Sequence, residues 1–313
     1  MDIDLLPPTS GLILTSDFLR IGSDVRELTR AVERGQLVKL RRGAYIRAAE
    51  WEAADDRGRH LVRADAVRCA ARQELPFAGA TAAAVWGMWQ HEYPNDVVVL
   101  DRWKGGGRSE PGVRRITAAA ATVSCRRVGG YLVTDVARTA IDVARAADFV
   151  RAVGPLDWAL WRRNPHRVTR EQLSAELEKL PSTLRRRFVE RAIGFASPLA
   201  DSYAESYARA LMFGLGFEVP ELQLEIPHDG GRYVVDFAWR SRRVIFEFDG
   251  FGKYLDPAMS GGDPARVVIA EKLREDELRR QGYTVIRGYW SDLMNPHALV
   301  AKLEAAGIQR GRR

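Results

Sequence analysis

Two short apolar stretches near the C-terminus place the strongest constraint on the fold. Tyr233 to Trp239 and Val244 to Phe248 are rich in β-branched and aromatic residues, which is typical of strands. Arg240 to Arg243 separates them and has the length of a hairpin connection. Whether this turn is a four-residue loop or a two-residue loop closed by an Arg240–Arg243 pair, counting back from it places Asp236 opposite Glu247. The sequence therefore predicts an antiparallel strand pair in which two carboxylates face each other.

The second of these strands also predicts which side chains share a face. Alternate residues of a strand point the same way, so Ile245, Glu247 and Asp249 lie on one side. Carboxylates directly opposed across a ladder repel each other, and a divalent cation such as Mg²⁺ or Mn²⁺ would compensate them. A shared proton, an arginine partner or a slipped register on a solvated edge are the alternatives. The metal site is favoured because Asp236, Glu247 and Asp249 all interrupt apolar runs.

The segments around this hairpin complete a mixed α/β core. A helix is predicted before it, from Ser202 to Phe213, followed by a strand from Leu222 to Ile226. After it we expect a helix from Pro264 to Gln281, a strand from Thr284 to Arg287 and a final helix from Pro296 to Ala306. The predicted order of the core is αβββαβ, with a helix added at its end.

Three further residues are candidates for the same site. Glu205 is a possible fourth metal ligand, although Ser202-x-x-Glu205 is also a capping-box spacing and Glu205 also pairs favourably with Arg209 one turn on. Lys253 follows the acids in a glycine-containing segment, and Lys272 lies on the next predicted helix. Either ammonium group would offset charge that develops on a phosphate. Their alternative role is that of ordinary solvated lysines.

The first 72 residues predict a winged helix-turn-helix. A short helix begins near Thr15, a second runs from Asp24 to about Arg34, and Gly35 ends it. Leu37 to Leu40 and Ala44 to Ile46 are predicted strands joined by a basic turn. This order of helix, turn, helix and hairpin is typical of a winged helix.

The charge of this region favours duplex DNA as the partner. From Arg20 to Arg47 there are eight basic and three acidic residues, a local excess of +5, which suits phosphate neutralisation. We expect Arg26 and Arg30 to face the major groove from the second helix, and Lys39, Arg41 and Arg42 to contact the backbone from the wing. A solvated helix face or a winged helix used for protein contacts is the alternative, and RNA stays open.

Composition limits the wider class of protein. Over 313 residues the chain carries 48 basic and 41 acidic side chains, a net charge of +7. Its two cysteines, Cys69 and Cys125, form no Cys-x-x-Cys motif, which argues against a disulfide scaffold or a structural zinc site. With an acidic first few residues and no apolar run of membrane-spanning length, we expect a cytoplasmic protein without membrane contact.

The domain organisation follows from length and from Pro and Gly punctuation. We expect a winged helix-turn-helix domain at residues 1–72, an α/β middle domain at 73–197 and the αβββαβ domain at 198–313.

The C-terminal motifs resemble those of a known nuclease group. Asp236-Phe237, Glu247-x-Asp249-Gly250 and Gly282-x-x-Val285-x-Arg287 are similar to the Vsr-like domains of the PD-(D/E)XK superfamily over about 110 residues. The resemblance implies a restriction-endonuclease-like fold in which Glu205, Asp236 and Glu247 bind Mg²⁺ or Mn²⁺, with Asp249 beside them. The chain departs from the pattern at two positions. Asp249 occupies the usual lysine position, and Lys253 replaces a histidine, so Lys253 or Lys272 would have to supply the cation.

The N-terminal motifs resemble a second group. Gly35 to Tyr45 is similar to the winged helix of AbiEi-type antitoxins, and the segments Gly79 to Gly87 and Leu132 to Asp142 are similar to the region that follows it. This resemblance implies DNA binding and a possible toxin partner.

Together these features support two expectations about function. The first is a DNA-binding, metal-dependent endonuclease or nickase, acting in DNA repair or phage defence, with Asp236, Glu247, Lys253 and Lys272 as its catalytic residues. The second is a DNA-binding transcriptional regulator or antitoxin-like protein whose C-terminal domain keeps the nuclease scaffold without turnover. Target site and oligomeric state stay open.

Overall fold

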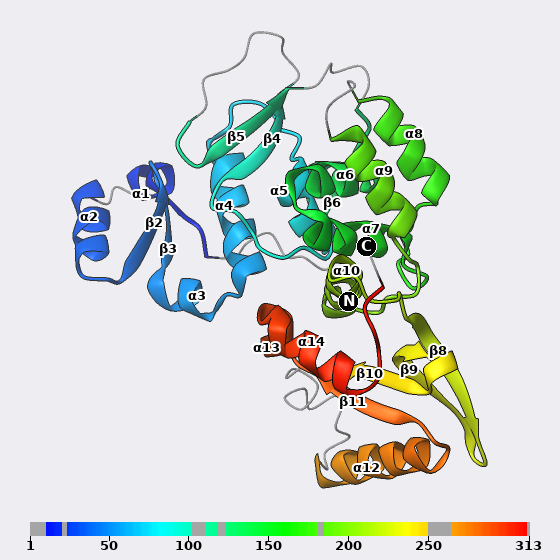
Figure 1. Ribbon diagram of the computed structural model, residues 1–313. Helices are drawn as coiled ribbons and strands as arrows, with labels where there is room; N and C mark the ends of the chain where they lie inside the picture. Colours follow the sequence, from blue (N-terminus) through cyan, green and yellow to red (C-terminus); the bar gives the residue numbers. More distant parts are fainter. Residues whose placement is uncertain are drawn as a thin grey trace. The chain divides into compact units, whose positions relative to one another are not determined.

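The protein has a mixed α/β fold with several small sheets (Figure 1). The computed structural model describes residues 11–20, 24–101, 110–117, 123–180, 185–249 and 264–311. The chain forms two compact units, one made of residues 1–147 and 165–194 and the other of residues 148–164 and 195–313. No helix in the described ranges has the length and apolar character needed to cross a membrane.

The first elements form the expected winged helix. They are β1 (Ile13–Leu14), α1 (Thr15–Arg20), α2 (Val25–Glu33), β2 (Leu37–Arg41), β3 (Ala44–Arg47) and α3 (Ala48–Ala53). The strands make a three-stranded sheet in the order β1-β3-β2. Leu28 of α2 is buried, and so are Tyr45 and Ile46, which point to opposite faces of β3. Gly43 takes a positive φ of 79° at the tip of the β2–β3 hairpin, a conformation that suits glycine.

The rest of the first unit combines helices with two strand pairs. Its elements are α4 (Asp56–Ala70), α5 (Gly79–Trp86), β4 (Val97–Asp101), β5 (Val113–Thr117), β6 (Cys125–Val128), β7 (Tyr131–Thr134), α6 (Val136–Ala146), α8 (Arg170–Glu178) and α9 (Arg186–Phe195), whose last residue belongs to the second unit. β4 and β5 are parallel, whereas β6 and β7 are antiparallel. The backbone of Phe77 bridges to Val99 and to Val133 and so joins the two pairs.

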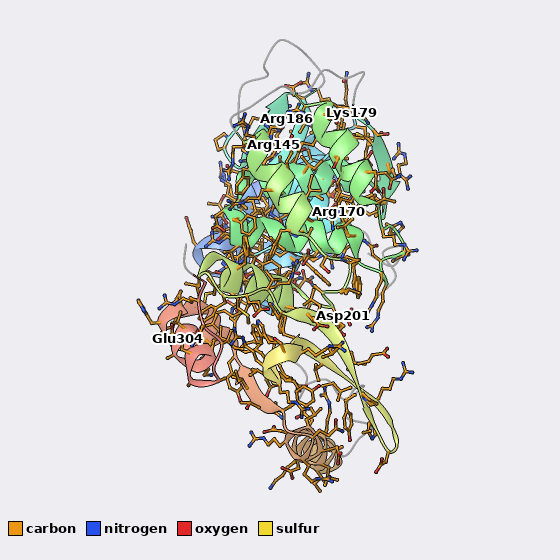
Figure 2. The ribbon with its side chains drawn as sticks, turned by 45° about the vertical axis from the view of Figure 1, so that its right-hand side comes forward. Arg145, Arg170, Lys179, Arg186, Asp201 and Glu304 are labelled. Carbon is orange, nitrogen blue, oxygen red and sulfur yellow. The ribbon has the colours of Figure 1, made fainter. Side chains whose placement is uncertain are left out.

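Arginine side chains join α8 to α9 (Figure 2). Arg170 at the start of α8 donates a hydrogen bond to the carbonyl oxygen of Ile193 in α9. Arg186 of α9 donates to the carbonyl oxygen of Leu180, just after α8, at 2.7 Å. Carbonyl groups at the end of a helix lack partners within the helix, so these guanidinium groups satisfy acceptors that would otherwise need water.

The second unit contains the expected order of elements together with helices that the sequence analysis did not place there. It contains α7 (Phe149–Leu160), α10 (Tyr203–Gly214), β8 (Glu221–His228), β9 (Gly231–Trp239), β10 (Val244–Phe248), α12 (Pro264–Arg280), β11 (Thr284–Gly288), α13 (Trp290–Met294) and α14 (Pro296–Ala305). From α10 to β11 this is the predicted αβββαβ order. The strands form a four-stranded sheet in the order β11-β10-β9-β8. β10 runs antiparallel to β9 and parallel to β11.

The two faces of this sheet carry separate cores. Phe237, Val244 and Phe246 pack with α10, α13 and α14 on one face. Ile245 packs on the other face with Leu278 of α12. Figure 1 shows α12 on the opposite side of the strands from α13 and α14. The predicted alternation of β10 is therefore confirmed, and Glu247 and Asp249 lie on the face that α12 covers.

A buried ion pair ties α7 to α10. Nη2 of Arg209 donates to Oδ1 and Oδ2 of Asp157 at 3.0 and 2.9 Å, and both side chains are almost fully buried. Asp157 also accepts a hydrogen bond from the backbone of Ser197 at 2.7 Å, and Arg209 donates to the carbonyl oxygen of Phe195 at 2.8 Å. Arg209 is thus engaged by Asp157 and Phe195, and the expected pairing with Glu205 one turn earlier is not the contact that holds it.

Replacing Asp157 with Asn is expected to destabilise the second unit by about 3–5 kcal/mol, because it leaves the buried Arg209 without its counter-charge. The free energy of unfolding from urea denaturation measures this loss. A double variant, Asp157→Leu with Arg209→Met, should recover much of it, since it removes both charges. Arg163→Ala, which removes the exposed partner of an ion pair with the partly buried Asp201, should change stability by about 0.5 kcal/mol or less. Equal losses for Asp157→Asn and Arg163→Ala would contradict this role of the pair.

The domain boundaries predicted from the sequence stay predictions. The two compact units instead follow the packing, because α7 precedes the predicted C-terminal boundary in sequence yet belongs to the second unit. The elements that carry the candidate site, α10 and the ends of β9 and β10, all belong to the second unit.

Candidate functional site

The second helix of the winged helix has one apolar and one basic side. Asp24 caps its start by accepting a hydrogen bond from the backbone of Arg26 at 2.9 Å. Leu28 is buried, whereas Arg26 and Arg30 are exposed. Residues four apart lie on the same side of a helix, so Arg26 and Arg30 form one basic face. This face presents two guanidinium groups to solvent.

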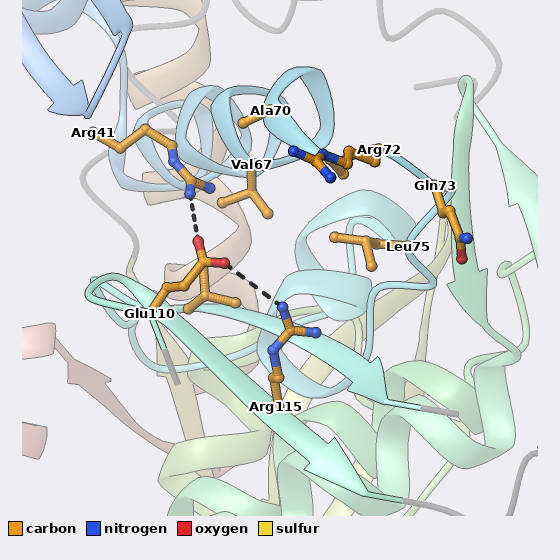
Figure 3. A pocket seen from close by; sticks show the side chains of 10 residues that line it. Arg41, Val67, Ala70, Arg72, Gln73, Leu75, Glu110 and Arg115 are labelled. Carbon is orange, nitrogen blue, oxygen red and sulfur yellow. Dashed lines mark hydrogen bonds and ion pairs between the residues drawn. The ribbon is translucent and has the colours of Figure 1, made fainter. Parts of the chain in front are cut away.

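Fewer basic side chains of the wing are exposed than the sequence predicted. Lys39 and Arg42 are exposed. Arg41 is instead half-buried, and its Nη2 donates to Oε2 of Glu110 at 2.7 Å (Figure 3). The pairing of β2 with β3 shifts between Lys39 and Arg41. Such an irregularity breaks the alternation of the strand, so that Lys39 and Arg41 can differ in environment.

In the second unit, the carboxylate of Glu205 lies buried at the start of α10. Its oxygens accept hydrogen bonds from the backbone of Asp201 and from Oγ of Ser202, each at 2.9 Å, and from Nε2 of Gln223 at 3.3 Å. Oγ of Ser202 accepts in turn from the backbone of Glu205 at 3.1 Å, which confirms Ser202 as the helix cap. Burial, followed by the negative charge of Asp236, raises the pKa of Glu205 to about 7.

Asp236 lies where the β9–β10 ladder ends. The observed register pairs Val244 with Trp239 and Phe246 with Phe237, as the turn predicted. At the next position Oδ2 of Asp236 accepts a hydrogen bond from the backbone of Phe248 at 2.9 Å. The carboxylate of Asp236 therefore extends the ladder by one side-chain bond, in place of a simple face-to-face pair with Glu247.

Gln223 donates to Glu205 from a strand that neighbours Asp236. It lies in β8 between the pairs Leu222–Phe237 and Leu224–Val235, which is the position opposite Asp236. Its φ is 50°, an unusual backbone conformation for a residue other than glycine. Such conformations cost about 1–3 kcal/mol and often occur at functional sites. The amide of Gln223 thus reaches Glu205 from the strand position opposite Asp236.

Glu247 has an arginine partner from α12. Nη2 of Arg274 donates to Oε1 of Glu247 at 2.7 Å and to the carbonyl oxygen of Val234 at 2.6 Å. Both side chains are partly buried, so the attraction between them is screened less than at an open surface. An arginine partner was one of the alternatives to a metal ion at this residue.

Asp249 has a different arginine partner. Nη1 of Arg287 lies 3.3 Å from Oδ2 of Asp249 and 3.6 Å from Oε2 of Glu271, and Nη2 lies 3.1 Å from Oε2 of Glu275. Arg287 also stands in register with Glu247 across the parallel β10–β11 pair. One guanidinium group therefore links the end of β10 to α12.

The structure brings some of the predicted residues together and separates others. Glu205 and Asp236 are electrostatic neighbours, while Glu247 and Asp249 contact Arg274 and Arg287. Across the described ranges, no three acidic, histidine or cysteine side chains gather closely enough to hold a metal ion. The metal and catalytic roles of these acids stay predictions. Lys272 is exposed on α12, and Lys253 lies outside the described residues.

Sequence reasoning missed Gln223, Arg274 and Arg287 as members of this site. A signal for Arg274 was present, because it precedes the buried Leu278 by four residues and so faces the sheet with it. Arg287 was part of the Gly282-x-x-Val285-x-Arg287 motif, but its alignment with Glu247 depends on the parallel register of β10 and β11. Nothing in the sequence marked Gln223, since its position depends on the pairing of β8 with β9.

Comparisons with known proteins find a family match for the N-terminal region. Residues 4–48 match the family model described as "Transcriptional regulator, AbiEi antitoxin", and this match covers the winged helix from β1 to β3. Two relatives, the uncharacterized proteins Rv2248 and MT2308 of two Mycobacterium tuberculosis strains, are each 29% identical over 233 residues, 74% of this chain and 80% of theirs. The crystal structure of the RV2827C protein from the same species aligns with a TM-score of 0.39 and 17% identity, over 63% of this chain and 75% of that one.

The raised pKa of Glu205 predicts a pH-dependent stability. The folded protein holds a proton on Glu205 that the unfolded chain releases above the ordinary glutamate pKa of 4.5, so this stabilisation is present below pH 4.5 and is lost as pH rises through about 7. The difference corresponds to about 3 kcal/mol. From pH 5 to pH 8, the free energy of unfolding of Glu205→Gln should therefore rise by about that amount relative to wild type. Exposed Glu221→Gln is the control, and a parallel pH response of Glu205→Gln and wild type would contradict the prediction.

Proposed function

We propose that this chain is a DNA-binding transcriptional regulator whose winged helix binds double-stranded DNA. The observation that carries the proposal is the exposed basic face of α2, with Arg26 and Arg30 one turn apart on a helix whose opposite side is buried through Leu28. In winged helices such a helix enters the major groove and the hairpin contacts the backbone. Arg26 and Arg30 read base edges in this proposal, and Lys39 and Arg42 bind phosphates.

The family match supports the same proposal and extends it. The matching family is described as a transcriptional regulator and an antitoxin, and the match covers the residues that carry the basic face. A toxin protein is accordingly the proposed second partner. The +5 charge excess between Arg20 and Arg47 would supply the attraction to DNA whether the chain acts as a transcriptional regulator or as an antitoxin.

Salt dependence of DNA binding provides the test. Each phosphate contact releases a counterion, so removing one contact lowers the slope of log K against log salt by about 0.9 in magnitude. Fluorescence anisotropy with the promoter of its own gene should show this reduction for Lys39→Ala and for Arg42→Ala. Arg187→Ala, an exposed arginine of α9 outside the winged helix, is the matched control. Unchanged slopes in Lys39→Ala and Arg42→Ala would rule out the wing as a phosphate contact.

A second candidate function is metal-dependent hydrolysis of a phosphodiester, with the Vsr-like resemblance of the C-terminal motifs as its background. The position of the buried carboxylate of Glu205 favours it, because burial and, after it, the negative charge of nearby Asp236 raise the pKa of Glu205, and a cation would stabilise the charged form of both acids. Carboxylate and amide oxygens suit a hard cation. Glu205 and Asp236 would hold it, and Glu247 would join them only after leaving Arg274.

Other residues of the chain would position the metal ligands and offset the charge of the phosphate. A bound Mg²⁺ or Mn²⁺ supplies an activated water and neutralises phosphate charge. Gln223 keeps Glu205 oriented, and the hydrogen bond from Phe248 keeps Asp236 in place. Arg274, once released from Glu247, is positioned to offset charge on a phosphate, a role that the sequence had suggested for Lys253 or Lys272.

Plasmid cleavage distinguishes the two functions. If the second function holds, the full chain nicks or cuts plasmid with Mg²⁺ or Mn²⁺, and Glu247→Ala reduces the rate by at least about a hundredfold, since a ligand of the ion is lost. DNA binding by the winged helix should be unaffected in the same variant. Absence of cleavage with every metal and substrate, together with intact promoter binding, would leave the regulator as the function of the chain.

A further inference from the structure

A cavity of about 330 Å³ lies between the wing and the core of the first unit (Figure 3). The end of α4, the strand β5 and the last residue of β2 line it, together with Glu110. Its apolar floor is made by Val67 and Val113. Pockets for small ligands usually measure about 300–1,000 Å³, so this cavity has room for a compact molecule and not for a large one.

Positive charge predominates in the lining. Arg41, Arg72 and Arg115 supply three guanidinium groups against the single carboxylate of Glu110, a formal excess of 3 − 1 = +2. The C-terminal end of α4 also borders the cavity through Ala70, and a helix end of this kind contributes only about half a negative charge. The cavity therefore keeps a clear positive excess.

Glu110 lies between two of the arginines without satisfying both. Its Oε2 is 2.7 Å from Nη2 of Arg41, but its Oε1 is 4.0 Å from Nη2 of Arg115. Figure 3 shows Arg41 and Arg115 directed toward Glu110 from opposite sides. Within the described part of the chain, the buried Nε of Arg115 has no hydrogen-bond partner. At 4.0 Å the carboxylate of Glu110 is too far from Nη2 of Arg115 for a hydrogen bond, so this group can donate to an additional anion.

We propose that this cavity binds a small phosphate dianion, either inorganic phosphate or the phosphate group of a small phosphomonoester. A phosphate monoester carries about −1.5 to −2 charge at pH 7, which matches the excess of +2 in the lining. Its oxygens accept the paired hydrogen bonds that guanidinium groups donate. Glu110 is the internal competitor, because its carboxylate already occupies part of the position that the anion takes between Arg41 and Arg115.

Isothermal titration calorimetry on the full chain in about 0.15 M KCl tests the site, because salt at this level screens weak binding to exposed charges. Inorganic phosphate and glycerol 3-phosphate are the two probes, and the one that binds more tightly identifies the source of the phosphate group. Saturable binding of one equivalent is expected. Arg115→Ala should weaken it about tenfold or more, because charge-assisted hydrogen bonds are lost. Glu110→Gln should tighten it, since the competing carboxylate becomes neutral.

Arg114→Ala is the matched control. Arg114 is the exposed neighbour of Arg115 on β5, and alternate residues of a strand point to opposite faces, so its loss should leave the affinity unchanged. Thermal unfolding of each variant confirms that it is folded. The proposal is overturned if neither probe binds, if Arg114→Ala and Arg115→Ala weaken binding equally, or if Glu110→Gln weakens it. It is also overturned if Arg115→Ala affects only DNA binding, because the cavity would then serve the DNA backbone.

Discussion

Compensation of buried negative charge controls how the C-terminal sheet is assembled. β9 and β10 both bring carboxylates to the same end of the sheet, where an isolated charge away from water is costly. Asp236 accepts a backbone hydrogen bond from Phe248, Glu247 pairs with Arg274, and Asp249 pairs with Arg287. Glu205 instead has a raised pKa. Arg274 comes from α12 and Arg287 from the neighbouring strand β11, so these acids connect the end of β10 to the covering helix and to the next strand, and any cation that binds there has to compete with those contacts.

In the winged helix, by contrast, the positively charged side chains have to stay exposed to solvent. Arg26 and Arg30 remain exposed while the same helix buries Leu28, so stability and solvent-facing charge are separated onto two sides of α2. Arg41 is the exception, because Glu110 engages it. A basic residue on a wing is thus not automatically a DNA contact. Its neighbours decide whether it faces solvent or joins the wing to the remainder of its unit.

The sequence was sufficient for local structure and insufficient for side-chain partners. The hairpin of β9 and β10, its register and the side of the sheet on which Glu247 lies all follow from a turn length and from alternation, both of which are local properties. The contact of Glu247 with Arg274 joins residues 27 positions apart, and the arrangement of Gln223 depends on strand pairing. The acidic residues could be read from the sequence. Which arginine pairs with Glu247 and which with Asp249 depends on how α12 and β11 pack.

The ion pair between Asp157 and Arg209 has a consequence for how the chain can be dissected. α7 belongs with the second unit, yet residues 165–194, which follow it, return to the first, so the polypeptide passes between the units three times. A fragment that starts at residue 198 would expose the surface that α7 covers and would keep Arg209 without Asp157. Neither unit is a single continuous segment of the sequence. Recombination or truncation that preserves one of them must therefore carry a piece of sequence from the middle of the gene.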